Sequence, residues 1–295
     1  MHRDRPSKTA ANIAAARARE AARPHGERIC DDPLAVHFLS PAFRLMRRIA
    51  PVHAYLQRRN NRLLPGMFGA LVARTRFIDD CLRTALDNGL QQLVILGAGY
   101  DSRAYRFDGL EEQRIRVFEV DHPATQAVKI RKLTALYGRR PAHVAFVPVR
   151  FHREALACGL LNAGYDGSLK TFFVWEGVTM YLSAASVDRT LRFMADNSRQ
   201  GSETVFDCFP PEVVDGRSTL REARTLRRYV ARIGEPLRFG LDAEAIEGFL
   251  AARGFTAVRV VNSAACKPLY FKGADARRKV SAILSFVHAA VAGRP

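Results

Sequence analysis

The sequence predicts an α/β fold with a doubly wound, mostly parallel β-sheet. The chain has 295 residues, enough for one large α/β domain, and 48% of them are hydrophobic. From Gln91 onward, short apolar runs alternate with segments of helical composition, and the runs are apolar almost throughout, as in strands that are buried on both faces. Such an alternation is typical of a parallel sheet with helices packed on both sides.

The region before this alternation is predicted to be helical. Residues 9–22 have helical composition, and "DDPLAVHFL" supplies an Asp cap, a Pro at the first helical position and an apolar stripe. A further helix is expected at about 70–89, with its apolar residues near one face. We therefore expect residues 1–89 to form a helical N-terminal lid over a core that comprises residues 90–295.

Within this core, the apolar runs predict the strands and the intervening segments predict the helices. Strands are expected at 93–97, 116–121, 143–149, 171–177, 203–208 and 256–263. Helices are expected at about 123–137, 153–163 and 184–199. A helical insertion that is rich in arginine is expected at about 209–240, and a short helix with Asp242 as its N-cap precedes the sixth strand.

The charge and the cysteines limit the classes of partner. There are 46 basic against 29 acidic residues, a net charge of +17, which is compatible either with an anionic partner or with arginines spread over solvated helix faces. No five basic residues are adjacent, so a nucleic-acid partner is not expected.

The five cysteines form no CxxC pair, which predicts no metal site and a reducing, cytoplasmic location. No apolar stretch is long enough to span a bilayer, so we expect no membrane partner, and the oligomeric state is left open.

The residues after each predicted strand are the candidates for ligand binding, because ligands of doubly wound sheets lie beyond the carboxyl ends of the strands. Gly97 and Gly99 permit a tight turn and a close approach of the backbone to a ligand. A dinucleotide site would require a third glycine at the position of Ser102. The carboxylate of Asp101 would repel a pyrophosphate, but it could accept hydrogen bonds from an ammonium group.

Two further carboxylates favour S-adenosylmethionine over a nicotinamide dinucleotide as the ligand. Asp121 ends the second predicted strand, where it could bind both hydroxyls of a ribose, and Glu176 follows the fourth, where it suits a ligand with an amino group and a sulfonium. Simpler interpretations stay open at this point. The glycines could form only a turn, Glu119 could pair with Arg103 or Arg106, and Glu176 could be a helix N-terminal carboxylate.

Several motifs together resemble one family. These motifs are "LGAGYDSRAYRF", "VFEVDHPATQAVK", "FVPV" and "FFVWEGVTMYL", with the upstream "DDPLAVHFL" and "RTRFIDD". They are similar to the leucine carboxyl methyltransferase-like family of class I S-adenosylmethionine-dependent methyltransferases, in its bacterial polyketide O-methyltransferase-like branch. The resemblance runs from about residue 30 to about residue 263. It implies a Rossmann-like core and S-adenosyl-L-methionine as the cofactor.

The resemblance also implies roles for residues at the sheet edge. Gly97 would lie against the cofactor, Asp121 would hold the ribose hydroxyls, and Glu176 would lie near the methionine end. Arg150 stands where the family usually has an Asp that accepts a hydrogen bond from the adenine amino group, followed here by Phe151. An arginine has donors only, so Arg150 could instead stack on the adenine or bond to a ring nitrogen, while Phe151 could supply apolar contact.

Basic residues from the N-terminal region complete the expected cofactor site. By the resemblance, Arg74 in "RTRF" would pair with the methionine carboxylate, with Arg76 as the alternative if the helix register differs. Arg17 would match a basic residue that reaches the cofactor in some members of the family. Gly99, Asp101 and His122 are included in the expected cofactor-binding set.

The expected activity is the O-methylation of a carboxylate or hydroxyl group of a small molecule. A protein C-terminal carboxyl methyltransferase is the first alternative, and a protein that binds S-adenosylmethionine with weak or lost transferase activity is the second, to which Arg150 lends weight. His122 could be a general base or a structural neighbour of the cofactor, and Tyr181 could face the acceptor or pack internally. We assign no catalytic base, and a dehydrogenase remains possible only if Ser102 can replace the third glycine.

Overall fold

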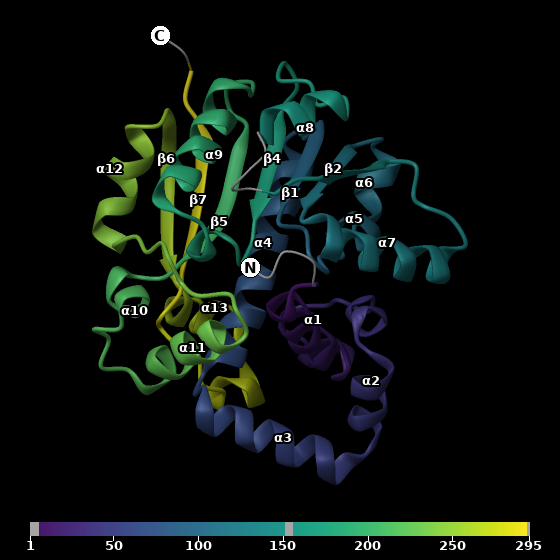
Figure 1. Cartoon of the computed structure of the whole chain (residues 1–295), viewed down its shortest axis with the longest axis vertical. Helices are drawn as coiled ribbons and strands as arrows, with labels where there is room; N and C mark the ends of the chain where they lie inside the picture. Colours follow the sequence, from purple (N-terminus) through teal and green to yellow (C-terminus); the bar gives the residue numbers. More distant parts are fainter. Residues whose placement is uncertain (1–5, 151–155, 294–295) are drawn as a thin grey trace.

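The computed structural model describes residues 6–150 and 156–293 and contains one seven-stranded sheet (Figure 1). The strand order is β3-β2-β1-β4-β5-β7-β6, and β1 to β5 pair in parallel, whereas β7 is antiparallel to both β5 and β6. The strand bounds are β1 Gln92–Leu96, β2 Arg116–Asp121, β3 Val144–Pro148, β4 Thr171–Trp175, β5 Glu203–Cys208, β6 Phe255–Asn262 and β7 Ser285–Val291. The predicted α/β fold with a doubly wound, mostly parallel sheet is therefore confirmed, although β7 was not predicted.

Alternate side chains of the strands enter two different cores, as expected for a sheet that is buried on both faces. In β1, Leu93 and Ile95 pack on the side of helix α4, and Val94 and Leu96 pack on the side of α8, α9 and α12. The helices that follow β1 to β4 are α5 Arg103–Arg106, α6 Asp108–Glu112, α7 Pro123–Tyr137, α8 Leu156–Asn162 and α9 Ala184–Asp196, and α12 Ile246–Ala251 precedes β6.

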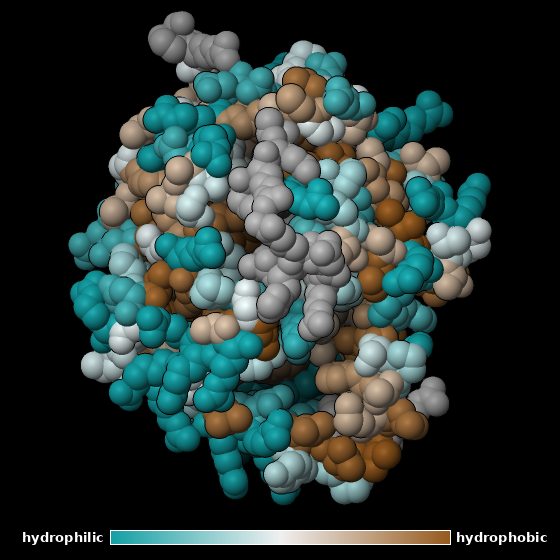
Figure 2. Space-filling view, viewed as in Figure 1, coloured by the Kyte–Doolittle hydropathy of each residue, from teal (hydrophilic) through white to brown (hydrophobic). Residues whose placement is uncertain are grey.

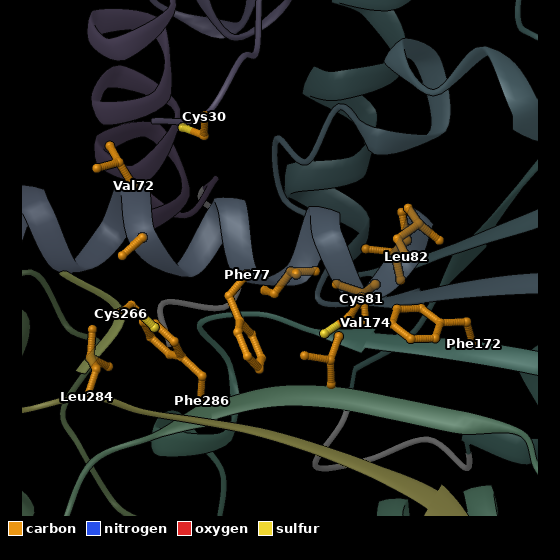
Figure 3. Close-up of a cluster of buried hydrophobic side chains, with 14 of the residues drawn as sticks. Cys30, Val72, Phe77, Cys81, Leu82, Phe172, Val174, Cys266, Leu284 and Phe286 are labelled. Carbon is orange, nitrogen blue, oxygen red and sulfur yellow. The ribbon is translucent and has the colours of Figure 1, made fainter. Parts of the chain in front are cut away.

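Helix α4 (Met67–Asp87) connects the sheet to the N-terminal segment. Figure 3 shows Phe77 pointing from α4 toward Val174 and Phe286 on the strands, whereas Val72 projects from the other side of the helix, the side on which Cys30 lies. The rings of Phe77 and Phe286 have centroids 5.6 Å apart. Apolar residues on both sides of the helix explain why its 21 residues are largely buried, beyond the single apolar stripe that its sequence suggested.

The other N-terminal helices lie beyond one end of the sheet, in the lower part of Figure 1. They are α1 Lys8–Ala21, α2 Pro41–Arg48 and α3 Ala50–Leu63. The segment "DDPLAVHFL" forms a 3-10 helix, Ala35–Phe38, rather than a longer α-helix, because Leu39 is extended and Ser40 then caps α2. The ring of Phe38 stacks on Tyr100, which follows β1, with centroids 5.5 Å apart. This contact anchors the N-terminal segment to the carboxyl end of β1, but its role as a lid stays a prediction.

The segment after β5 contains α10 Pro211–Asp215 and α11 Arg221–Arg232, and α13 Lys267–Tyr270 lies between β6 and β7. The short 3-10 helices are His25–Glu27, Thr179–Tyr181, Ala243–Ala245, Ser263–Cys266 and Gly273–Arg277. Among the helices described, none combines the length and the apolar character needed to cross a lipid bilayer.

Candidate functional site

A cavity of about 420 Å³ lies at the carboxyl ends of β1, β2 and β4. Residues of α1 and of the segment after α11 also line it, so segments far apart in the sequence enclose one space. Most of the residues predicted to bind a ligand are among its walls, namely Gly97, Gly99, Asp101, Asp121, His122, Arg150, Glu176 and Tyr181. Phe151 lies outside the described residues, and Arg74 lies close behind the wall.

Both predicted glycines are required by close contacts with other segments. Gly97 has a φ of +67°, and a Cβ at this position would lie 2.3 Å from Cγ2 of Val178. Gly99 has a φ of +42°, and its Cβ would lie 3.1 Å from Cβ of Ala10 in α1. The turn after β1 therefore fits tightly between the loop after β4 and the N-terminal helix, in addition to leaving its backbone open to the cavity.

The carboxylate of Asp121 is oriented by two backbone amides. The N–H of Gly99 donates to Oδ2 at 2.8 Å, and the N–H of His122 donates to Oδ1 at 2.6 Å. Burial raises the pKa of Asp121 to about 6, although these two amides and the more distant Lys129 act in the opposite direction. Each carboxylate oxygen still has acceptor capacity for one further donor.

His122 caps helix α7. Its Nδ1 accepts a hydrogen bond from the N–H of Ala124 at 3.3 Å, and the residue is almost fully buried. Since Nδ1 accepts this bond, it carries no proton in this arrangement. The geometry therefore favours the interpretation of His122 as a structural neighbour of the cavity over that of a general base.

An ion-pair network lies beneath the cavity, and Arg103 is at its centre. The guanidinium of Arg103 contacts Asp79 at 2.7 Å, Asp101 at 2.5 Å and Glu176 at 2.6 Å, and the residue is 1% exposed. Burial acts to lower the pKa of Arg103, but these three carboxylates outweigh it and hold the pKa well above its usual value. Both acidic residues predicted at the methionine end are thus already paired with one arginine.

The suggested pair of Glu119 with Arg103 or Arg106 is wrong. Glu119 lies in the interior of β2 and contacts Nζ of Lys129 in α7 at 2.8 Å, while Arg106 pairs with Asp79 at 2.7 Å. No sequence pattern directly indicated that Arg103 pairs with three carboxylates. Only its spacing of two residues from Asp101 could have suggested it, since the N–H of Arg103 also donates to Oδ1 of Asp101 at 2.8 Å.

Arg74 extends the network to β5. Its Nε donates to Oε1 of Glu176 at 3.0 Å, and its Nη1 donates to Oδ2 of Asp207 at 2.6 Å. Burial acts to raise the pKa of Glu176, but Arg103 and Arg74 outweigh it and hold the pKa below its usual range. Arg76, the alternative to Arg74, instead pairs with Asp80 on the outer side of α4 at 2.8 Å.

Gly177 separates the guanidinium of Arg74 from the cavity. A Cβ at Gly177 would lie 3.4 Å from Nη1 of Arg74, and Gly177 itself lines the cavity. The N–H of Gly177 donates to Oδ1 of Asp207 at 2.6 Å, which fixes this loop against β5. Within the described part of the chain, Nη2 of Arg74 is buried without a well-directed hydrogen bond, although it lies 3.0 Å from Oε1 of Glu176.

Arg17 reaches the cavity from α1 and is held by the "DDP" motif. Oδ1 of Asp32 accepts from the N–H of Ala35 at 3.0 Å, and Oδ2 accepts from Nε of Arg17 at 2.7 Å. The guanidinium of Arg17 also donates to the backbone carbonyl of Tyr100. The predicted cap residue therefore has a second role, because it orients a cationic side chain in the wall of the cavity.

Polar residues of α1 and of the segment after α11 form another wall of the cavity. The hydroxyl of Thr9 bonds to the carboxylate of Glu235, and Nδ2 of Asn12 donates to the hydroxyl of Tyr229 at 2.7 Å, so α1 is joined to α11 and the segment after it. Tyr181 lines the cavity in the same region, and burial raises its pKa. Thr9 and Glu235 were not predicted, because no local pattern relates residues that are 226 positions apart.

Comparison with known proteins gives consistent matches. A family model described as leucine carboxyl methyltransferase matches residues 10–195. A Bacillus subtilis protein named as an S-adenosyl-L-methionine-dependent methyltransferase is 29% identical over 218 residues, which is 74% of this chain and 71% of that protein. A Streptomyces coelicolor protein with the same kind of name is 35% identical over 195 residues, 66% of each chain. The matched region thus spans about two thirds of the length of these relatives.

The solved structures support the fold. A crystal structure from Thermobifida fusca, titled as a methyltransferase, aligns with a TM-score of 0.62 at 17% identity and covers 98% of this chain and 96% of that one. At this identity, the likeness concerns the fold alone. No group of three or more His, Cys, Asp or Glu side chains in the described residues could hold a metal ion.

Proposed function

Because this chain belongs to the leucine carboxyl methyltransferase family of S-adenosylmethionine-dependent methyltransferases, we propose that it transfers a methyl group to an oxygen atom of a small molecule bound in the cavity described above. The proposal depends on one observation. The same cavity is lined by the glycine turn and Asp121, which are expected to bind the methyl donor, and by a separate polar wall that contains Thr9 and Glu235.

The ribose end of S-adenosylmethionine fits the position of Asp121. The two amides that bind Asp121 leave each oxygen able to accept from one hydroxyl, and a ribose offers two neighbouring hydroxyls. A side chain at Gly97 or Gly99 would collide with Val178 or Ala10, so the two glycines keep this turn in the wall of the cavity. Arg150 lines the same cavity and is the residue that we assign to the adenine side.

The charge of the network fits the methionine end of the donor. Three guanidinium groups, those of Arg74, Arg103 and Arg106, connect four carboxylates, those of Asp79, Asp101, Glu176 and Asp207, so the fully ionised network has one negative charge in excess. S-adenosylmethionine carries an ammonium, a carboxylate and a sulfonium, which leave one positive charge. We assign its ammonium to the carboxylates that line the cavity and its carboxylate to Arg17, which lines the cavity, whereas Arg74 lies behind Gly177 and holds Glu176 in place.

The donor supplies a methyl group that is already activated by the sulfonium charge, so the main task of the protein is alignment of the acceptor. Tyr181, Thr9 and Glu235 form the polar wall that we assign to the acceptor. A carboxylate acceptor is ionised at neutral pH and needs no base, whereas a hydroxyl acceptor could transfer its proton to Glu235. The bonds between α1 and the α11 region favour a small molecule over the terminus of another protein chain, because they join the two segments that cap the cavity.

The second candidate is a protein that binds S-adenosylmethionine with weak or lost transferase activity, and Arg150 is the observation that favours it. An Asp at this position would accept a hydrogen bond from the adenine amino group, which an arginine cannot do. If this inherited contact is missing, Arg150→Asp is expected to tighten binding by about 3-fold to 10-fold, the value of one hydrogen bond.

The first experiment is calorimetric titration of the protein and of Arg150→Asp with S-adenosylmethionine and, separately, with NAD. Binding of S-adenosylmethionine without binding of NAD supports the proposal. Absence of S-adenosylmethionine binding by both proteins would refute the assignment of the cavity.

The second experiment tests transfer. The protein is incubated with S-adenosylmethionine and a set of phenols, alcohols and carboxylic acids that includes 4-hydroxyphenylacetate, which carries both kinds of oxygen. A methyl ester releases methanol in alkali and an ether does not, so the product identifies the acceptor group. Donor binding without any S-adenosylhomocysteine formation across the set would favour the second candidate.

A further inference from the structure

Helices α2 and α3 expose an apolar surface that is separate from the cavity. We call it the α2–α3 face and define it by its large exposed apolar residues, Leu45, Met46, Ile49, Val52, Tyr55 and Leu63. Leu45 and Tyr55 are 61% and 64% exposed, which is among the highest values for large apolar residues in the described chain. Figure 2 shows hydrophobic side chains gathered at the lower right, where Figure 1 draws α2 and the beginning of α3. Exposed apolar side chains that gather in this way indicate an interaction site.

The same segment is strongly basic. Residues 41–63 include six arginines and no Asp or Glu, and the wider stretch 33–78 has no acidic residue at all. Of these arginines, Arg44, Arg58, Arg59 and Arg62 are exposed. Helix α11, which contacts α3, adds the exposed arginines Arg221, Arg224, Arg227 and Arg228. The excess of basic residues in the chain is therefore partly concentrated next to an apolar surface.

The apolar and basic side chains occupy the same face of α3. Val52, Tyr55, Arg59 and Leu63 follow one another at intervals of three or four residues, and Arg62, seven residues after Tyr55, lies on the side of Tyr55. Leu45 and Met46 belong to α2, and Ile49 is the extended residue that connects α2 to α3. Helices with exposed apolar residues and flanking arginines are typical of segments that lie in the interface of a lipid bilayer.

We propose that the α2–α3 face docks on an anionic membrane surface, with its apolar side chains in the interfacial region and its arginines on the lipid headgroups. A second copy of the chain fits this surface less well, because a twofold interface would place arginines against arginines. A nucleic acid would match the charge but leave the aliphatic residues without a partner. The earlier expectation of no membrane partner depended on the absence of a spanning segment, which surface docking does not require.

The test is sedimentation of the protein with vesicles made of equal parts of phosphatidylcholine and phosphatidylglycerol, with vesicles of phosphatidylcholine alone as the reference. Binding to the anionic vesicles is expected to exceed binding to the neutral ones and to weaken in high salt. Arg59→Gln with Arg62→Gln is expected to weaken binding by about 30-fold, since each arginine near such a surface contributes about 5-fold. The matched control, Arg139→Gln with Arg140→Gln, removes two exposed arginines that follow α7 and is expected to change binding little.

The apolar contribution is tested separately. Leu45→Ser with Tyr55→Ser is expected to weaken vesicle binding by about 10-fold or more while leaving the net charge unchanged. Leu161→Ser, which changes an exposed leucine of α8 at the opposite end of Figure 1, is the control. Thermal unfolding of each variant establishes that it is folded.

Three results would overturn the proposal. The first is no preference of the unmodified protein for anionic vesicles. The second is vesicle binding that the apolar substitutions do not weaken, which would indicate a purely electrostatic contact as with a nucleic acid. The third is a concentration-dependent dimer that the apolar substitutions abolish, which would identify a second copy as the partner.

Discussion

The buried carboxylate of Asp121 should make the binding of S-adenosylmethionine depend on pH. Its pKa is raised to about 6 in the folded protein. Donation by the ribose hydroxyls would stabilise the charged form, so the pKa would be lower in the complex and affinity would be lost as the pH falls through 6. The carboxylate is ionised to about 99% at pH 8 and about 9% at pH 5, so the dissociation constant should rise about 11-fold between these values, which corresponds to about 1.4 kcal/mol.

Calorimetric titration between pH 5 and pH 8 measures this dependence, and Asp121→Asn is the matched variant. The asparagine keeps an oxygen for the N–H of Gly99 but has no charge, so its binding at pH 8 should be about 10-fold weaker and nearly independent of pH. Tyr100, His122 and Lys129 are other ionisable groups near this carboxylate. If the slope persisted in Asp121→Asn, a neighbour such as His122 would be responsible and the reasoning would be refuted.

Three further predictions concern stability and the glycine turn. Without ligand, Asp121→Asn should have a free energy of unfolding at pH 8 that is higher than that of the unmodified protein by up to about 3 kcal/mol, because the ionised carboxylate is buried. Urea titrations should show that this difference in free energy shrinks below pH 6, and an equal difference at pH 4 would contradict the prediction. Arg103→Met should lower the free energy of unfolding by about 3 to 5 kcal/mol, since it leaves three buried carboxylates without their common partner. A loss below about 1 kcal/mol in urea titrations would show that Arg103 is not central to the stability of the network. Gly97→Ala should weaken calorimetric binding of S-adenosylmethionine through its clash with Val178, and Val178→Ala should partly restore it; binding unchanged by Gly97→Ala would show that the turn can shift.

Most of the fold could be predicted because the strands that form its parallel part are continuous apolar runs. The predicted and observed bounds of β2 and β5 coincide, as do those of α7. The strand β7 was not predicted, since a mostly apolar run of seven residues that contains His288 could equally be a short buried helix. Its place between β5 and β6 depends on pairing with distant residues, which no local pattern records.

The site was predictable where function depends on position at the end of a strand. Asp121 is the last residue of β2 and Glu176 follows β4, and parallel strands bring their carboxyl ends to one edge, so proximity followed from topology. Ion-pair partners that lie on other segments of the chain could not be predicted in this way. Arg103 is the main example, because the choice among its three carboxylates is made by the packing of α4 and the loop after β4.

The place of β7 in the sheet also constrains how the chain can assemble. β6 pairs with β7 and not directly with the parallel strands, and β7 is the last of the described strands to be synthesised. As the chain emerges from the ribosome, β1 to β5 can associate in order, but β6 has to wait without a partner until β7 inserts beside β5. During that interval, the free edge of β5 is open to pairing with another nascent chain, so substitutions that slow the insertion of β7 should reduce the yield of folded protein before they alter the activity of the molecules that do fold.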